Sequence, residues 1–274
     1  MARKLIAGSF QLALDRPLLM GIVNVTPDSF SDGGEHATAA QAIAHARRLI
    51  AEGADILDIG GESSRPGAQP VSLEDELARV MPVIEALVGS NIPLSIDTAK
   101  PAVMRLAIAA GASMVNDIEA LQRPGAMEAV AASNVAVCLM HMQGGPRNMQ
   151  AAPSYGDVVS EVGAFLVSRA EAALSAGIAR ERIVLDPGFG FGKTAEHNLT
   201  LLREFDALVR LDFPLLAGLS RKATLGAITG RPPGERVHVS VAAALIAAQR
   251  GASILRVHDV AATRDALVLW SQVR

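Results

Sequence analysis

The sequence predicts an α/β protein of the (β/α)8 TIM-barrel class, with a short N-terminal cap before Leu18. Eight short apolar segments alternate with longer, alanine-rich segments along the chain. The apolar segments are largely uninterrupted, as in parallel strands that are covered on both faces. The 274 residues suit one barrel, which takes about 250, so we expect a single domain over residues 1–274. An open doubly wound sheet remains the alternative, because alternation does not show whether a sheet closes.

The expected strands are the eight apolar segments, each of which is followed by a helical segment or a loop. In chain order they are Leu18–Asn24, Asp55–Gly60, Pro93–Asp97, Ser113–Asn116, Val135–His141, Arg182–Asp186, Phe213–Ser220 and Ser253–His258.

The segments between the strands show helical periodicity. Val158, Val162, Phe165 and Leu166 fall on one face of a helix, and residues 43–50 repeat the pattern less cleanly. Glycines follow several of these segments, the usual place for a left-handed helix end. The other expected helices are Ser72–Val88, Pro101–Ala110, Pro124–Ser133, Glu196–Val209, Arg236–Arg250 and Ala261–Val273.

Composition argues against several classes of protein. The formal net charge is −3, aromatic residues make up 3% of the chain, and no block of like charge occurs, so nucleic acid is not an expected partner. No apolar run approaches the ~18 residues that span a bilayer, so no membrane partner is expected. The single Cys138 rules out an intramolecular disulfide. We expect a cytoplasmic enzyme that acts on small molecules.

Polar residues stand at or near the C-terminal ends of nearly all the expected strands. In a barrel these ends converge on one mouth, where barrel enzymes carry out their chemistry. A single Asp after a strand is more often a helix cap than a catalyst, but a helix cap does not explain the repetition from strand to strand. In strand order the residues are Asn24, Asp58, Asp97, Asn116 with Asp117, His141, Asp186, Ser220 with Arg221 and Lys222, and Arg256 with His258.

The types of residue at this mouth indicate two kinds of ligand group. Asp97, Asn116 and Asp186 supply hydrogen-bond acceptors and one amide, which suit a heterocycle rich in N–H donors. The basic side chains after the last two strands suit a phosphate or diphosphate, and Arg256 lies within an apolar strand, where a charge needs a partner.

Two long loops follow the first two strands and should lie over this mouth. Thr26–Gly34 and Glu62–Pro70 are rich in glycine or proline, and such loops can exclude water from a site. The segment Gly188–Thr194 looks like a phosphate-binding loop, but Pro187 stands where that motif needs glycine. Cys138 should be a buried, inert thiol, because it lies within an apolar strand.

The ordered motifs along the chain resemble the dihydropteroate synthase family of pterin-binding enzymes. The resemblance runs from about Leu18 to Leu267 and is carried by long, specific segments. These segments are residues 21–34 (GIVNVTPDSFSDGG), 58–67 (DIGGESSRPG), 95–98 (SIDT), 115–117 (VND), 140–143 (MHMQ), 185–193 (LDPGFGFGK), 218–222 (GLSRK) and 256–258 (RVH).

The resemblance implies a transferase of folate biosynthesis on a barrel that pairs as a homodimer. The reaction would join 6-hydroxymethyl-7,8-dihydropterin diphosphate to 4-aminobenzoate, releasing diphosphate and forming 7,8-dihydropteroate. Substitution would be largely dissociative, with positive charge developing on the pterin. Mg²⁺ would be the cofactor, placed against the diphosphate by Asn24.

Residue roles follow from the same resemblance. Asp97, Asp186 and Lys222 would be the catalytic residues and, with Asn116, would hold the pterin. Ser64 stands where Thr is common in the family, and either hydroxyl can donate to phosphate. The diphosphate would be bound by Ser64, Arg256 and His258, and the 4-aminobenzoate pocket would be flanked by Arg221, Phe30 and Pro66 with Ser220 nearby.

Three other functions are compatible with a barrel of this kind. A methyltetrahydrofolate-binding barrel of the methyltransferase type would share the pterin residues but would not need the diphosphate set. An aldolase could form a Schiff base on Lys222. A non-catalytic barrel would be expected to lose charged mouth residues first, and none is missing here.

Overall fold

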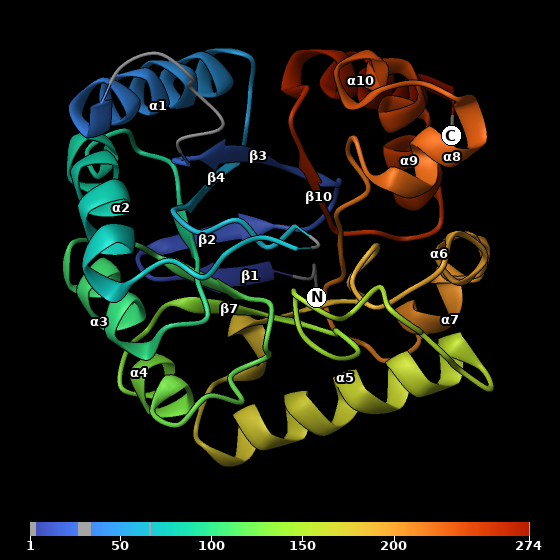
Figure 1. Cartoon of the computed structure of the whole chain (residues 1–274), viewed down its shortest axis with the longest axis horizontal. Helices are drawn as coiled ribbons and strands as arrows, with labels where there is room; N and C mark the ends of the chain where they lie inside the picture. Colours follow the sequence, from blue (N-terminus) through green and yellow to red (C-terminus); the bar gives the residue numbers. More distant parts are fainter. Residues whose placement is uncertain (1–3, 27–33, 66, 274) are drawn as a thin grey trace.

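The computed structural model describes residues 4–26, 34–65 and 67–273 of the chain. Eight parallel strands form one sheet at the centre, and helices follow one another around it in chain order (Figure 1). Among the described residues, no helix combines the length and the apolar character that crossing a bilayer requires.

The central sheet confirms the eight predicted strands, in the order β8-β7-β6-β5-β4-β3-β10-β9. Its edge strands meet at a bridge between Leu185 and Leu215, which nearly closes the sheet into a barrel and excludes the open alternative. Only β9 is much shorter than expected. The strands are β3 (Leu18–Asn24), β4 (Ile56–Gly60), β5 (Leu94–Asp97), β6 (Met114–Asp117), β7 (Ala136–Met140), β8 (Ile183–Asp186), β9 (Leu216–Ala217) and β10 (Ile254–Val257).

The helices largely match the predicted segments. One expectation was wrong, because Glu196–Val209 is not a single helix. The chain breaks at Glu204, and the break leaves Phe205 fully buried and stacked on Phe189. Helix α8 was not predicted. The helices are α1 (Gly34–Ala51), α2 (Leu73–Leu87), α3 (Pro101–Ala109), α4 (Ala126–Ala131), α5 (Val158–Ser175), α6 (Ala195–Arg203), α7 (Phe205–Val209), α8 (Ala223–Thr229), α9 (Val237–Gln249) and α10 (Val260–Val273).

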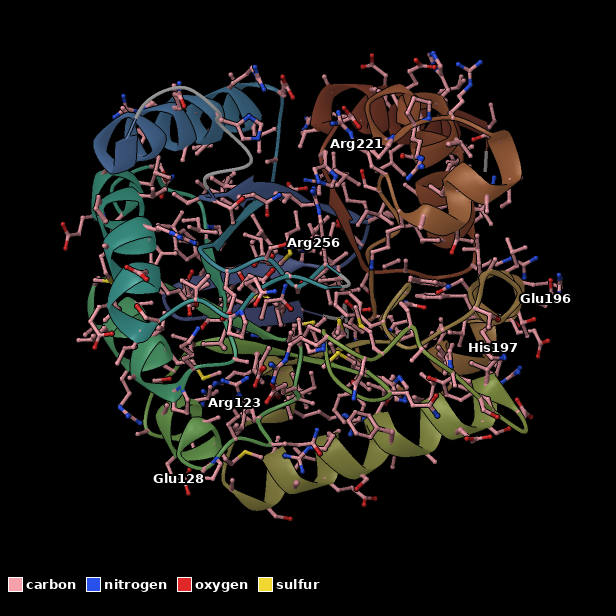
Figure 2. All side chains as sticks on the ribbon, viewed as in Figure 1. Arg123, Glu128, Glu196, His197, Arg221 and Arg256 are labelled. Carbon is pink, nitrogen blue, oxygen red and sulfur yellow. The ribbon has the colours of Figure 1, made fainter. Side chains whose placement is uncertain are left out.

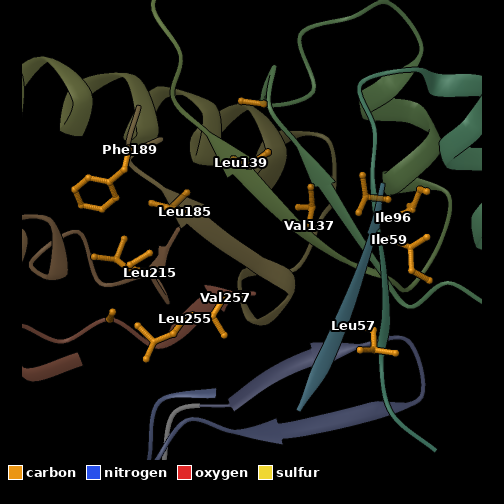
Figure 3. Close-up of a cluster of buried hydrophobic side chains, with 14 of the residues drawn as sticks. Leu57, Ile59, Ile96, Val137, Leu139, Leu185, Phe189, Leu215, Leu255 and Val257 are labelled. Carbon is orange, nitrogen blue, oxygen red and sulfur yellow. The ribbon is translucent and has the colours of Figure 1, made fainter. Parts of the chain in front are cut away.

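The larger core lies between the sheet and its helices. Leu57 and Ile59 of β4, Val137 and Leu139 of β7, and Leu255 of β10 belong to this layer, and alternate residues of each strand point into it (Figure 3). Because the other face of each strand is also buried inside the barrel, both sets of alternate positions read as apolar in the first half of each strand.

A smaller core fills the lower half of the barrel interior. The N-terminal cap is a two-stranded hairpin of β1 (Lys4–Ala7) and β2 (Phe10–Ala13), which crosses the centre of the ring in Figure 1. Leu5 and Ala7 of β1 pack against inward side chains from the starts of the barrel strands. These inward residues are Leu18, Met20, Ile56, Met114, Ala136, Cys138, Val184, Leu216 and Ile254.

The next inward positions along the same strands are polar. Asp58 follows Ile56, Asn116 follows Met114 and Arg256 follows Ile254, each two residues later. Because a strand turns alternate side chains to the same side, these polar groups lie directly above the apolar lower layer, at the mouth of the barrel.

Candidate active site

Asp58 and Arg256 lie at the centre of the layer of polar side chains at the mouth of the barrel. Arg256 donates from Nε to Asp58 Oδ2 (2.6 Å) and from Nη2 to Asp97 Oδ2 (2.7 Å). Asp58 Oδ2 also accepts from Asn116 Nδ2 (3.0 Å). Four strands, β4, β5, β6 and β10, are therefore joined by one hydrogen-bonded network, and Arg256 lies near the centre of the ring in Figure 2.

The charges of this network are buried. Asp58 has no exposed surface, and its Oδ1 has no hydrogen-bond partner among the described residues. Burial raises the pKa of Asp97 to about 7 against the opposing charge of Arg256, and Asp58 raises it further. Nearby carboxylates raise the pKa of Arg256, although burial opposes them. The guanidinium therefore stays charged between two carboxyl groups.

Asp186 and Lys222 form a second polar pair on the mouth. Asp186 ends β8, and its Oδ1 accepts from the backbone N–H of Gly188 (2.7 Å). Lys222 precedes α8, donates to the carbonyl of Phe189, and lies 4.6 Å from the centre of the Phe191 ring. Burial lowers the pKa of Lys222 to about 8, although the nearby Asp186 opposes that shift. This ammonium can donate to a ligand that lies beside Asp186.

Lys193 stabilises the Gly188–Thr194 loop, which looks like a phosphate-binding loop in the sequence. Lys193 is buried and donates to the carbonyls of Gly188 and Phe191 (3.0 Å each), and its Nζ lies 2.9 Å from His141 Nδ1. Burial lowers the pKa of Lys193 to about 7 and that of His141 to about 3. Lys193 therefore fixes Gly188, and the backbone N–H of Gly188 in turn donates to Asp186.

Ser220, Arg221 and His258 lie on the side of the mouth formed by β9 and β10. His258 Nδ1 lies 3.0 Å from Ser220 Oγ, and burial, with the nearby Arg256, lowers the pKa of His258 to about 3. Arg221 makes two hydrogen bonds to Asp259, of 2.5 and 3.1 Å. Next to these residues a hollow of about 330 Å³ extends to His45 on α1.

The remaining predicted residues fall on the loops and on β3. Asn24 is half-buried at the end of β3, in register with Gly60 of β4. Ser64 is half-buried in the loop after β4, beside Arg65, whose charge contributes to the low pKa of His258. Phe30 and Pro66 lie outside the described residues.

The described residues at the mouth could bind Mg²⁺ only if most of its ligands came from the substrate and from water. Between residues 4 and 273, leaving out 27–33 and 66, no group of three or more His, Cys, Asp or Glu could hold a metal ion. Asn24 offers one hard amide oxygen, and its register partner Gly60 lies close to Asp97, whose side chain a Cβ at Gly60 would contact at 3.4 Å. Mg²⁺ keeps several waters and binds proteins through few side chains when phosphate is present, so this donor set is compatible with it.

Sequence reasoning missed the roles of two residues. Asp58 was recognised as polar but was given no function, although it holds both Arg256 and Asn116. Asp259, which pairs with Arg221, was not singled out. A carboxylate inside an otherwise apolar strand is the signal that could have pointed to Asp58, because such a charge needs a partner. Cys138 is fully buried as predicted, and burial raises the pKa of its thiol.

Comparison with known proteins gives concordant results. The model of the family described as pterin binding enzyme matches residues 20–258. The dihydropteroate synthase of Neisseria meningitidis serogroup C is 54% identical over 269 residues, which is 96% of this chain and 95% of that protein. A structure of Xanthomonas albilineans dihydropteroate synthase with 4-aminobenzoic acid has a TM-score of 0.95 at 58% identity, covering 100% of this chain and 98% of the other. A Burkholderia cenocepacia dihydropteroate synthase complexed with 7,8-dihydropteroate has a TM-score of 0.91 at 54% identity, covering 100% and 97%.

Proposed function

Because the chain belongs to the pterin-binding enzyme family, we propose that the mouth of its barrel joins 6-hydroxymethyl-7,8-dihydropterin diphosphate to 4-aminobenzoate. The enzyme is a transferase with the activity of a dihydropteroate synthase, and its products are 7,8-dihydropteroate and diphosphate. A methyltetrahydrofolate-binding function is not favoured, since the matched relatives named above are synthases.

The observation that carries the proposal is the buried polar layer above an apolar barrel floor. Asp97, Asn116 and Asp186 offer acceptors to the N–H groups of a pterin, and Lys222 offers a donor to its carbonyl or ring nitrogen. Asp97 Oδ2 accepts from Arg256 Nη2, so a pterin bound at this carboxylate would compete with that hydrogen bond. The guanidinium would then turn toward the diphosphate while Asp58 keeps hold of its Nε.

The diphosphate would lie between the ends of β3, β4 and β10. Arg256, His258 and Ser64 supply donors there. Burial and the nearby arginines lower the pKa of His258, and the negative charge of a diphosphate would favour its protonated form. Mg²⁺, with Asn24 as its protein ligand, would neutralise charge on the leaving diphosphate.

The substitution would be largely dissociative. The carbon–oxygen bond to diphosphate breaks early, and positive charge develops on the pterin beside Asp97 and Asp186, which stabilise it. The nitrogen of the aromatic amine would form the new bond to the same methylene carbon and release one proton to solvent. An aromatic amine is already a nucleophile, so no strong base is needed. Arg221, which lines the hollow beside α1, would orient 4-aminobenzoate with Ser220 nearby, and the family resemblance adds Phe30 and Pro66 to this pocket.

The direct test is release of diphosphate from the dihydropterin diphosphate, with Mg²⁺, in the presence and absence of 4-aminobenzoate. Release that depends on aminobenzoate and yields dihydropteroate supports the proposal. A folded protein that binds pterin but forms no product would contradict it, and methyltetrahydrofolate would then be the next substrate to test. The homodimer, the cytoplasmic location and the assignment of all 274 residues to one domain stay predictions.

A further inference from the structure

A partly buried charge cluster lies at the root of the loop that follows β4. Lys100, just before α3, donates from Nζ to Glu62 Oε2 and to Glu76 Oε2, the latter at 2.5 Å. Glu62 stands at the start of the loop, and Glu76 lies in α2. One ammonium group therefore connects the loop to two helices of the barrel wall.

Glu62 also joins the two ends of this loop. Its second oxygen, Oε1, accepts from the backbone N–H of Val71, nine residues further on, at 3.0 Å. Arg79 of α2 donates to the carbonyl of Gly61 at 2.8 Å, just before the loop begins. The loop is consequently closed across its root, and the root is bonded to α2 and, through Lys100, to the start of α3.

The buried charge of Glu76 makes this connection specific. Glu76 has no exposed surface, and its Oε1 has no hydrogen-bond partner among the described residues. A buried carboxylate is costly without a counter-charge, so Lys100 is required at this point of the wall. Burial would lower the pKa of Lys100, but its two carboxylate partners raise it, so the ammonium keeps its charge.

The loop held in this way reaches the mouth. Ser64 lies two residues after Glu62, and the charge of the adjacent Arg65 acts on His258. Further along, Gly67 donates its backbone N–H to the carbonyl of Pro146, in the loop after β7 (3.2 Å). A displacement at the root would be passed to Ser64 over two residues of backbone.

We propose that Glu62 and Lys100 are positioning residues for diphosphate recognition, because they fix the root of the loop that presents Ser64. The inference rests on the function proposed above. Neither residue touches substrate in this account. The pterin ring would be held by Asp97, Asn116, Asp186 and Lys222, whose side chains bond to other strands and to the loop after β8. Losing the link should therefore weaken recognition of the diphosphate more than recognition of the ring.

The variant that isolates the link is Glu62→Gln. The amide oxygen can still accept from Val71, Lys100 stays with Glu76, and Arg79 stays with the carbonyl of Gly61, so the change removes only the contact between Lys100 and Glu62. Asp212→Asn is a matched control, since it makes the same acid-to-amide change in an exposed pair with Arg180, after α7 and away from this loop. Both variants should be compared with the wild type in KM for dihydropterin diphosphate, in Kd for 6-hydroxymethyl-7,8-dihydropterin, and in Tm.

The expected result is a rise of about 10-fold in KM for the diphosphate substrate in Glu62→Gln, with Kd for the dihydropterin within about twofold of wild type. Asp212→Asn should match wild type in both constants. A KM that stays within about twofold of wild type, or equal weakening of both ligands, would overturn the proposal. Failure of the wild-type enzyme to make dihydropteroate would instead refute the proposed function.

Discussion

The lower and upper halves of the barrel interior are built on the same strands, are both largely buried, and differ in chemistry. The lower positions are apolar and pack on the N-terminal hairpin, whereas the positions two residues further along carry carboxylate, amide and guanidinium groups. The matched pairs are Ile56 and Asp58, Met114 and Asn116, Val184 and Asp186, and Ile254 and Arg256.

This difference shows that burial alone does not distinguish a core from a site. Ile56 and Asp58 both have no exposed surface, yet one packs in a cluster and the other holds two polar partners. Replacing a buried ion pair by apolar residues often leaves a fold equally stable or more stable. The upper layer is therefore best explained by the ligand it is built to receive, and the lower layer by the stability of the barrel.

The largest effect is expected at Asp97. In Asp97→Asn the residue loses the charge that would stabilise a cationic pterin, so kcat/KM should fall by about 10³-fold. The fold should survive. At pH 4, where the Asp97 carboxyl is protonated, the free energy of unfolding should lie within about 1 kcal/mol of wild type, because the amide oxygen can still accept from Arg256 and Asp58 still pairs with it.

Steady-state assays of dihydropteroate formation and urea denaturation measure these two quantities. Near-normal turnover in Asp97→Asn would remove the catalytic role from this carboxylate.

In the lower layer we expect a loss of stability with little loss of activity. Met114→Ala removes a fully buried side chain below Asn116, so the free energy of unfolding should fall by about 2–5 kcal/mol. At a temperature where the variant is folded, kcat/KM should stay within about threefold of wild type, since no polar group of the mouth is lost. A large loss of kcat/KM with unchanged stability would mean that the two layers are not separate in function.

A smaller effect is expected in the pH dependence of stability. Asp97 has a pKa of about 7 in the folded enzyme, above its unfolded value, so the folded state binds the extra proton between about pH 4 and pH 7. Its contribution to stability is present below pH 4 and is lost as pH rises to 7. His141 and His258, with pKa values of about 3, act in the opposite direction.

The difference between wild type and Asp97→Asn isolates this contribution. Relative to the variant, wild type should lose about 1–4 kcal/mol of unfolding free energy between pH 4 and pH 7, measured without ligand. A difference that does not change with pH would show that Asp97 is ionised throughout this range.

The sequence predicted the strands well because parallel strands are apolar on both faces. That same property hid the alternation between wall and interior, so the lower and upper layers could not be separated beforehand. Closure depends on Leu185 meeting Leu215, a contact between distant segments with no local signal. The break at Glu204 also lacks a local signal, since neither glycine nor proline stands there, and packing of Phe205 accompanies it.

The location of the candidate site could be predicted from the sequence, but the hydrogen bonds within it could not. Strand ends located Asp97, Asn116, Asp186 and Arg256 at the mouth, and the family resemblance supplied their roles. The network was not predictable, because Arg256 and Asp58 are 198 residues apart in the sequence and only the barrel brings them together. The contact between Lys100 and Glu62 could not be predicted either, because the two residues are 38 positions apart and only the fold brings them together.

The most direct test of the two-layer account compares neighbours on one strand. Asp58→Asn and Ile56→Ala change adjacent inward positions of β4, and kcat/KM and the free energy of unfolding would be measured for both. Asp58→Asn should lower kcat/KM by about 100-fold, because Arg256 and Asn116 lose their common carboxylate. Ile56→Ala should lower stability by about 2–5 kcal/mol and leave kcat/KM near wild type. Equal losses of activity in the two variants, or full activity in Asp58→Asn, would contradict the account.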